Sequence, residues 1–219
     1  MAATLTSCTT SGLVEEGGTA SLQTEARAKS IGTSTNPYEA SGAVFAEIYE
    51  KLLDSVAEQN LGSILATAHT VNGFNTLYLS GYLPLTSSQI EAVVHNSKTN
   101  FDALNNILGM SPQGFGRLTA MVNGLQDLKN DSASYESAVS FILNLESGIL
   151  TATDLTEQER RITLMTTALV LQKLDVEKRK KRKDRDWELS IGHIAATAYG
   201  ATYSEPNAII SGLASLYLE

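Results

Sequence analysis

Residues 156–174 read TEQERRITLMTTALVLQKL, and this stretch decides the fold class. Thr156 and Glu159 stand three positions apart, as the two ends of a capping box that begins a helix. Apolar residues then recur at the spacing of one helix face: Ile162, Met165, Leu169 and Leu174. The stretch therefore predicts a long helix, which we expect to continue to about Arg185.

The same helical spacing recurs on both sides of this stretch, in five stripes between residues 44 and 149 and in a final one after Pro206. Thr86–Gln89 is a second capping box, and Ser111-Pro112 fits an N-cap followed by the first helical residue. Residues 72–82 are the best strand candidate, although their Asn-Gly start is also a normal helix exit. We predict an all-α fold, a single-domain helical bundle of about six to eight helices. An irregular α-solenoid-like array is the alternative.

Composition narrows the class of protein. The chain has 219 residues, of which 42% are hydrophobic and 18% charged, as expected for one or two globular domains rather than a disordered chain. The mean hydropathy of -0.06 argues against a polytopic membrane protein. A single cysteine excludes an internal disulfide framework and a zinc site built from cysteines.

The single cysteine stands near the N-terminus, where residues 5–8 read Leu5-Thr6-Ser7-Cys8. This tetrad resembles the lipobox of bacterial lipoproteins, in which the cysteine receives lipid. The resemblance implies lipid attachment at Cys8 and a location in the bacterial cell envelope. A full signal also has a basic region and an apolar region of 7–15 residues. We expect these to lie upstream of Met1 or to have been trimmed away.

A polar segment follows the cysteine. Residues 9–36 contain 10 Ser or Thr and 4 Gly. Such a segment buries too little apolar surface to offset the entropy lost on ordering. We expect residues 1–36 to be a signal remnant and a flexible tether, and residues 37–219 to form one all-α domain.

The net charge of -8 conceals one basic segment, residues 173–188, which holds 8 of the 16 Lys and Arg residues. Most of them form a candidate interaction patch: Lys178, Arg179, Lys180, Lys181, Arg182, Lys183 and Arg185. The run is typical of a solvated helix end. Acidic lipid headgroups or an acidic protein are alternative partners. Nucleic acid is disfavoured, because the rest of the chain is acidic and no aromatic residues interleave the run.

Residues 189–219 form a C-terminal helical segment rich in small residues. Gly192, Ala196 and Gly200 recur every fourth position, so on a helix they make a smooth stripe that another backbone can approach closely. The stripe favours tight packing inside the bundle, with dimerisation as the alternative.

Familiar catalytic patterns do not occur in the sequence. Glu91 and His95 are four positions apart, whereas di-iron bundles use a spacing of three. His69 and His193 lie among small and apolar residues, a setting typical of packed histidines. The chain has no phosphate-binding glycine loop, no nucleophile elbow and no His-Glu-x-x-His. We therefore expect no catalytic, cofactor-binding or metal-binding residues.

Three functional hypotheses follow. The first is a non-enzymatic helical envelope lipoprotein that acts as a scaffold or accessory subunit, held at the membrane by its lipid, with an envelope protein or a second copy as partner. The second is a soluble helical assembly subunit, of a virion or a cytoplasmic complex, that contacts its partner through the basic segment. An enzyme with an unrecognised helical site comes third, because the motifs for it are missing.

Overall fold

The computed structural model describes residues 35–56, 58–77, 82–180 and 187–218. The chain divides into two units, residues 1–33 and 34–219, and every described residue lies in the second. The described elements are all helical and include no strand, which confirms the all-α prediction. They are α2 (Glu39–Leu53), α3 (Leu61–Ala68), α4 (Asn72–Leu77), α5 (Ser87–Thr99), the 3-10 helix η1 (Phe101–Leu104), α6 (Asn105–Leu108), α7 (Pro112–Asn130), α8 (Tyr135–Thr151), α9 (Glu157–Lys180), α10 (Ile191–Tyr203) and α11 (Glu205–Leu218).

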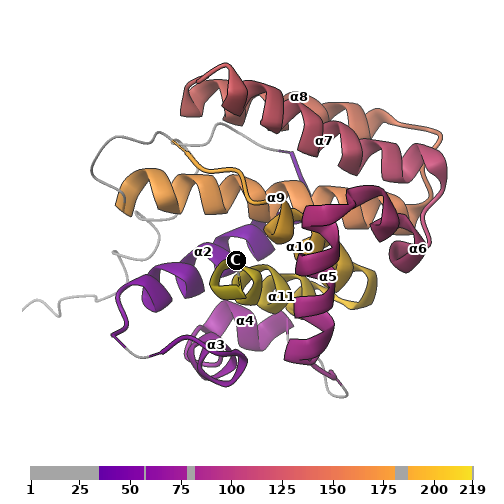
Figure 1. The fold of residues 1–219 in the computed structure, drawn as a ribbon. Coiled ribbons are helices and arrows are strands. Elements are labelled where there is room, and N and C mark those ends of the chain that lie inside the picture. Colours follow the sequence, from indigo (N-terminus) through magenta and orange to yellow (C-terminus); the bar gives the residue numbers. More distant parts are fainter. Residues whose placement is uncertain (1–34, 57, 78–81, 181–186, 219) are drawn as a thin grey trace, which may run out of the picture. The chain divides into compact units, whose positions relative to one another are not determined.

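Helix α9 runs through the middle of this unit (Figure 1). Helices α7 and α8 pack on one side of it, and α2, α10 and α11 pack on the other. Every residue of α9 from Ile162 to Glu177 is buried, the polar ones included. A helix buried on all sides must find partners for its polar side chains inside the protein. Some partners lie within α9, such as the Ile162 carbonyl that accepts a hydrogen bond from Thr166. Others come from neighbouring elements, such as the Tyr135 hydroxyl that donates to Asp175. Gln172 Oε1 has no partner among the described residues.

The start of α9 is a capping box, as predicted. Thr156 Oγ1 accepts a hydrogen bond from the Glu159 amide (3.2 Å), and Glu159 Oε2 accepts one from the Thr156 amide (2.9 Å). The other oxygen, Glu159 Oε1, accepts a hydrogen bond from the amide of Ser111 (2.6 Å), which is the N-cap of α7. One carboxylate therefore ties together the starts of α7 and α9. A Cβ on Gly114 would lie 2.6 Å from the same oxygen, so this close approach requires glycine.

A buried polar cluster joins the chain before α2 to α8 and α9. The Asn36 side-chain amide donates hydrogen bonds to Glu146 Oε1 (2.6 Å) and to the Leu164 carbonyl (2.8 Å). Thr167 Oγ1 also donates to Glu146 Oε1 (2.7 Å). Asn36 is the last residue of the predicted tether, but it is buried in the folded unit, where its amide satisfies a buried carboxylate and a buried carbonyl.

Nearer its C-terminal end, α9 carries a buried ion pair. Lys173 Nζ and Glu177 Oε2 lie 2.9 Å apart, and their side chains are 4% and 7% exposed. Lys173 also donates to the Glu188 carbonyl (2.9 Å), and the Tyr49 hydroxyl donates to Glu177 (3.3 Å). These extra hydrogen bonds offset the cost of removing both charges from water.

Two stretches depart from the predicted pattern. The third apolar stripe, predicted as one helix, divides into α5, η1 and α6, because Asn100 leaves the helical region and its side chain caps η1. Within the strand candidate, residues 72–77 form helix α4. The described part of the chain therefore has ten α-helices and one 3-10 helix, more than the six to eight predicted.

The Glu159 carboxylate accepts hydrogen bonds at the starts of both α7 and α9, and this predicts how the stability of the fold depends on pH. Hydrogen bonds from Ser111 and Thr156 lower the pKa of Glu159 to about 2, from an ordinary value of 4.5, although burial acts in the opposite direction. Because the folded-state pKa is the lower one, the ionised carboxylate stabilises the fold fully above about pH 5, and this contribution is lost as the pH falls towards 2.

We therefore expect Glu159→Gln to be less stable than wild type at neutral pH, with a difference that shrinks between about pH 5 and pH 3. Urea unfolding at a series of pH values measures it. Glu58→Gln, which alters an exposed side chain, is the control and should follow wild type throughout. A Glu159→Gln difference that stays constant with pH would contradict the assignment.

Candidate functional site

The residues singled out from the sequence lie in three places. Cys8 lies outside the described residues, and so do four members of the basic patch, Lys181, Arg182, Lys183 and Arg185. The other three members end α9, and the small-residue stripe lies on α10.

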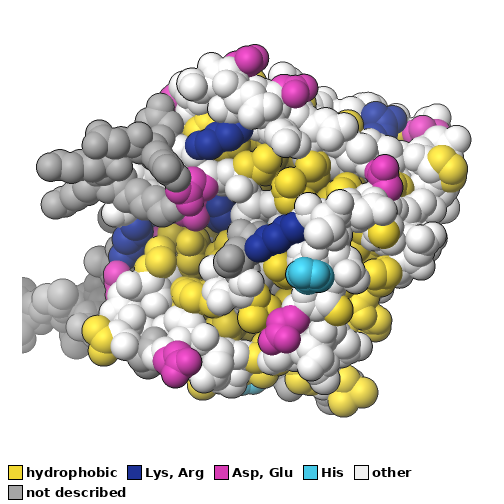
Figure 2. Space-filling view, in the orientation of Figure 1, with side chains coloured by type: hydrophobic (Ala, Val, Ile, Leu, Met, Phe, Trp, Pro, Cys, Tyr) yellow, Lys and Arg dark blue, Asp and Glu magenta, His cyan; other side chains and the backbone are white. Residues whose placement is uncertain are grey.

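The described end of the basic patch makes intramolecular contacts. Arg179 Nε donates to Asp175 Oδ2 (3.0 Å), and the same guanidinium also bonds to Glu50 of α2. Lys180 Nζ lies 2.6 Å from Asp54, just after α2. These pairs fasten α9 to the end of α2. Among the residues that Figure 2 colours by type, the Lys and Arg side chains on the face in view are scattered.

The remaining described member, Lys178, lies with its ammonium 5.6 Å from the centre of the Tyr135 ring. The Tyr135 hydroxyl in turn donates to Asp175 Oδ1 (3.3 Å). Burial and the negative charge of Asp175 raise the pKa of Tyr135. Asp175 is thus held by Tyr135 on one oxygen and by Arg179 on the other.

The small-residue stripe of Gly192, Ala196 and Gly200 is buried within the chain. A Cβ on Gly200 would lie only 2.4 Å from the Asn207 carbonyl oxygen of α11. Helices α10 and α11 therefore cross so closely that a side chain at position 200 would separate them. This crossing sets the angle of the α10–α11 corner.

The three histidines differ in their exposure to solvent. His193 is buried, with Nδ1 2.9 Å from the Gly212 carbonyl and its ring packed on Phe45. Burial and the positive charge of Lys173 lower the pKa of His193 to about 3, so the ring is neutral at physiological pH. His69 and His95 are exposed.

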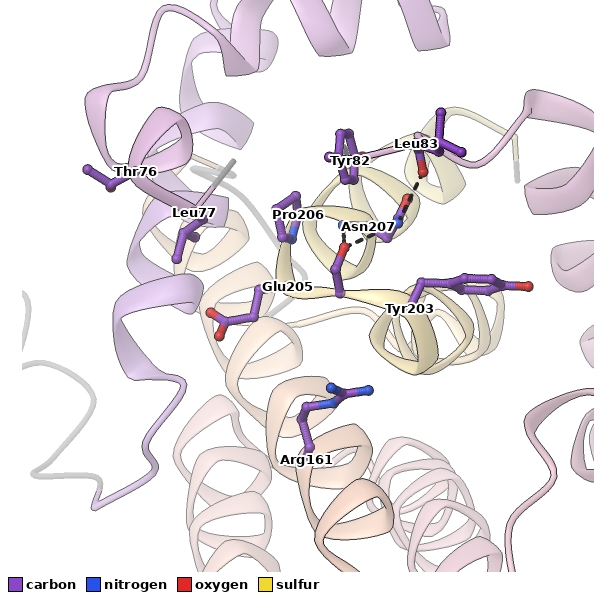
Figure 3. Close-up of a pocket in the computed structure, with 10 residues that line it drawn as sticks. Thr76, Leu77, Tyr82, Leu83, Arg161, Tyr203, Glu205, Pro206 and Asn207 are labelled. Atoms are coloured by element: carbon purple, nitrogen blue, oxygen red, sulfur yellow. Dashed lines mark hydrogen bonds between the residues drawn. The ribbon is translucent and has the colours of Figure 1, made fainter. Parts of the chain in front are cut away.

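A cavity of about 630 Å³ opens where the α10–α11 corner meets α4 and the start of α9 (Figure 3). Its walls combine aromatic, aliphatic, amide and charged side chains: Thr76, Leu77, Tyr82, Leu83, Arg161, Tyr203, Ser204, Glu205, Pro206 and Asn207. These residues come from four separate parts of the chain, so only the folded protein assembles the cavity.

The corner itself is held by hydrogen bonds. Ser204 is extended and follows the last residue of α10. Its hydroxyl accepts a hydrogen bond (3.2 Å) from the amide of Asn207, which lies in the first turn of α11. The Asn207 side chain accepts a bond from the Leu85 amide (3.1 Å) and donates one to the Leu83 carbonyl (3.4 Å). Asn207 therefore fixes the loop on one wall of the cavity to the corner that forms the other wall.

Two oppositely charged side chains, Glu205 and Arg161, line the cavity, and they differ in how fully they are hydrogen-bonded. Glu205 accepts a hydrogen bond from the Ser41 hydroxyl of α2. Arg161 donates through Nη2 to the Thr202 carbonyl (3.2 Å). Its Nε atom is buried, and among the described residues none accepts a hydrogen bond from it. The described ion pairs do not include one between Arg161 and Glu205. Arg161 therefore retains unused hydrogen-bonding capacity beside the cavity.

Sequence reasoning missed this cavity. The available signals were Arg161 at the start of an otherwise apolar helix face, and Ser204-Glu205-Pro206, a break followed by a helix start. Neither signal indicates that the two segments meet. Among the described residues, no helix is long and apolar enough to cross a membrane, and no group of three or more His, Cys, Asp or Glu side chains could hold a metal ion.

Comparison of the chain with protein-family models, with curated proteins and with solved structures finds no match.

The contacts of Arg179 lead to a prediction for the basic patch. Arg179→Glu would place a third carboxylate beside Asp175, whose side chain is 5% exposed, and Glu50. We expect it to lower the free energy of unfolding by roughly 1–2 kcal/mol, since a largely buried charge loses its partner while the arginine itself is half exposed.

Lys180→Glu is the matched control, because its partner Asp54 is 67% exposed whereas Asp175 is buried, and exposed pairs contribute less than about 1 kcal/mol. Chemical denaturation of both variants measures the difference. Equal effects would show that Asp175 does not depend on Arg179.

Proposed function

We propose that this chain is a non-enzymatic helical lipoprotein of the bacterial cell envelope that serves as a scaffold or accessory subunit. The observation that carries the proposal is Leu5-Thr6-Ser7-Cys8, with its single cysteine, followed directly by a polar segment. A lipid-anchored protein needs such a segment to hold its folded part away from the membrane. As a flexible coil, residues 9–36 would span about 30 Å.

The organisation of the folded unit supports a binding role. Helix α9 carries buried charged side chains that form hydrogen bonds with other groups of the same chain, among them Lys173, Asp175 and Glu177. Two of the large apolar residues that are exposed in the described part of the chain line the cavity, Leu83 at 82% and Tyr203 at 54% exposure. Large apolar side chains beside a cavity are typical of interaction sites.

The experiment is to isolate the protein from its native host and measure the mass of its N-terminal peptide in the membrane fraction. We expect a peptide that begins at Cys8 and carries acyl groups. A Cys8→Ser variant expressed from the same locus is the control, and it should leave the membrane fraction and lose the acyl mass.

A peptide that contains residues 1–7 and no acyl group would contradict the proposal. That result would favour the soluble assembly subunit, for which the basic segment at residues 173–188 is the support. The decisive variant would then be a charge reversal within that segment, with partner capture as the readout.

A further inference from the structure

We propose that the cavity at the α10–α11 corner binds a small amphipathic organic anion, with one acidic group held by Arg161 and an apolar or aromatic body held by the cavity wall. The inference concerns the folded unit alone and does not depend on lipid attachment at Cys8. The volume of about 630 Å³ falls in the range of roughly 300–1,000 Å³ that small-molecule sites occupy.

Arg161 supplies the recognition of the acidic group. A guanidinium has five N–H donors in a planar fork that matches a carboxylate or sulfonate. Only Nη2 has an acceptor among the described residues, the Thr202 carbonyl, while the buried Nε has none. Nε itself is shielded from the cavity, but Nη1 is not among the buried atoms and has no acceptor among the described residues. An anion in the cavity would therefore be bound through Nη1 by a charge-assisted hydrogen bond.

Glu205 shapes the selectivity of the site. Its carboxylate is already bonded to the Ser41 hydroxyl, and it is the first residue of α11, where the helix dipole favours negative charge. It is therefore compensated by its own surroundings and does not neutralise Arg161. A second negative charge on the ligand would be repelled by Glu205, so the site should prefer a monoanion to inorganic phosphate.

The remaining wall suits an apolar body. Leu77 and Pro206 line the cavity, and Leu83 and Tyr203 present exposed side chains beside it. Figure 3 shows the aliphatic and aromatic side chains on several sides of the opening, with Arg161 rising from α9 below the corner. A ligand with a hydrocarbon or aromatic body would cover part of this surface and remove it from water.

A pair of fluorescent probes tests the inference. Anilinonaphthalene sulfonate is an aromatic monoanion, and phenylnaphthylamine has the same ring system without the sulfonate. We expect the sulfonate probe to bind the full chain saturably. Arg161→Gln should weaken this binding by at least about tenfold and should change the binding of the neutral probe by less than about twofold.

Arg117→Gln is the matched control, because Arg117 lies on α7 with Asp154 as its neighbour at 3.7 Å, away from the cavity-lining residues. It should leave both probes unaffected. Inorganic phosphate at millimolar concentration should fail to displace the sulfonate probe.

Absence of saturable binding, equal binding by wild type and Arg161→Gln, or displacement by phosphate would each overturn the proposal. Should Arg161→Gln fail to melt cooperatively, Tyr203→Ala replaces it, since Tyr203 is 54% exposed and its loss should spare the fold. Tyr203→Ala should weaken both probes, and unchanged binding of both would overturn the proposal.

Discussion

Helix α9 is buried on every side from Ile162 to Glu177, and the rest of the described unit is arranged to meet this constraint. Burial of such a helix is costly unless most of its polar groups have partners, and on α9 nearly all of them do, Gln172 Oε1 being an exception among the described residues. Glu146 and Asn36 meet Thr167, and Tyr135 meets Asp175. These partners come from α8 and from the chain before α2, so the burial of α9 fixes several elements at once.

The cavity is a consequence of the same arrangement. Helices α10 and α11 cross closely enough that Gly200 contacts the Asn207 backbone, and this crossing creates a sharp corner beside the start of α9. Arg161 stands where α9 begins to be enclosed, with Nε already buried and the rest of its side chain beside open space. Arg161 is the one cation among the described residues that line the cavity, and its guanidinium is partly desolvated and only partly hydrogen-bonded. The proposed anion site rests on this residue.

Local signals in the sequence predicted much of the secondary structure. The capping boxes at Thr86 and Thr156 and the N-cap at Ser111 are confirmed, because such boundaries depend only on residues a few positions apart. The burial of Asn36 could not be predicted, since its partner Glu146 is 110 positions away. The cavity could not be predicted for the same reason, because its lining residues come from segments far apart in the sequence, and the apolar periodicity of each helix does not indicate which segments meet. The lipid attachment at Cys8 and the basic segment remain predictions.

Hydrogen exchange tests the central role of α9 most directly. Under native conditions, followed by mass spectrometry, amides from residues 162–177 should exchange only through global unfolding, with an opening free energy equal to that from chemical denaturation. Amides of the short helix α3, which has only two buried residues, should exchange much sooner. Exchange of residues 162–177 at a rate similar to that of α3 would contradict the account.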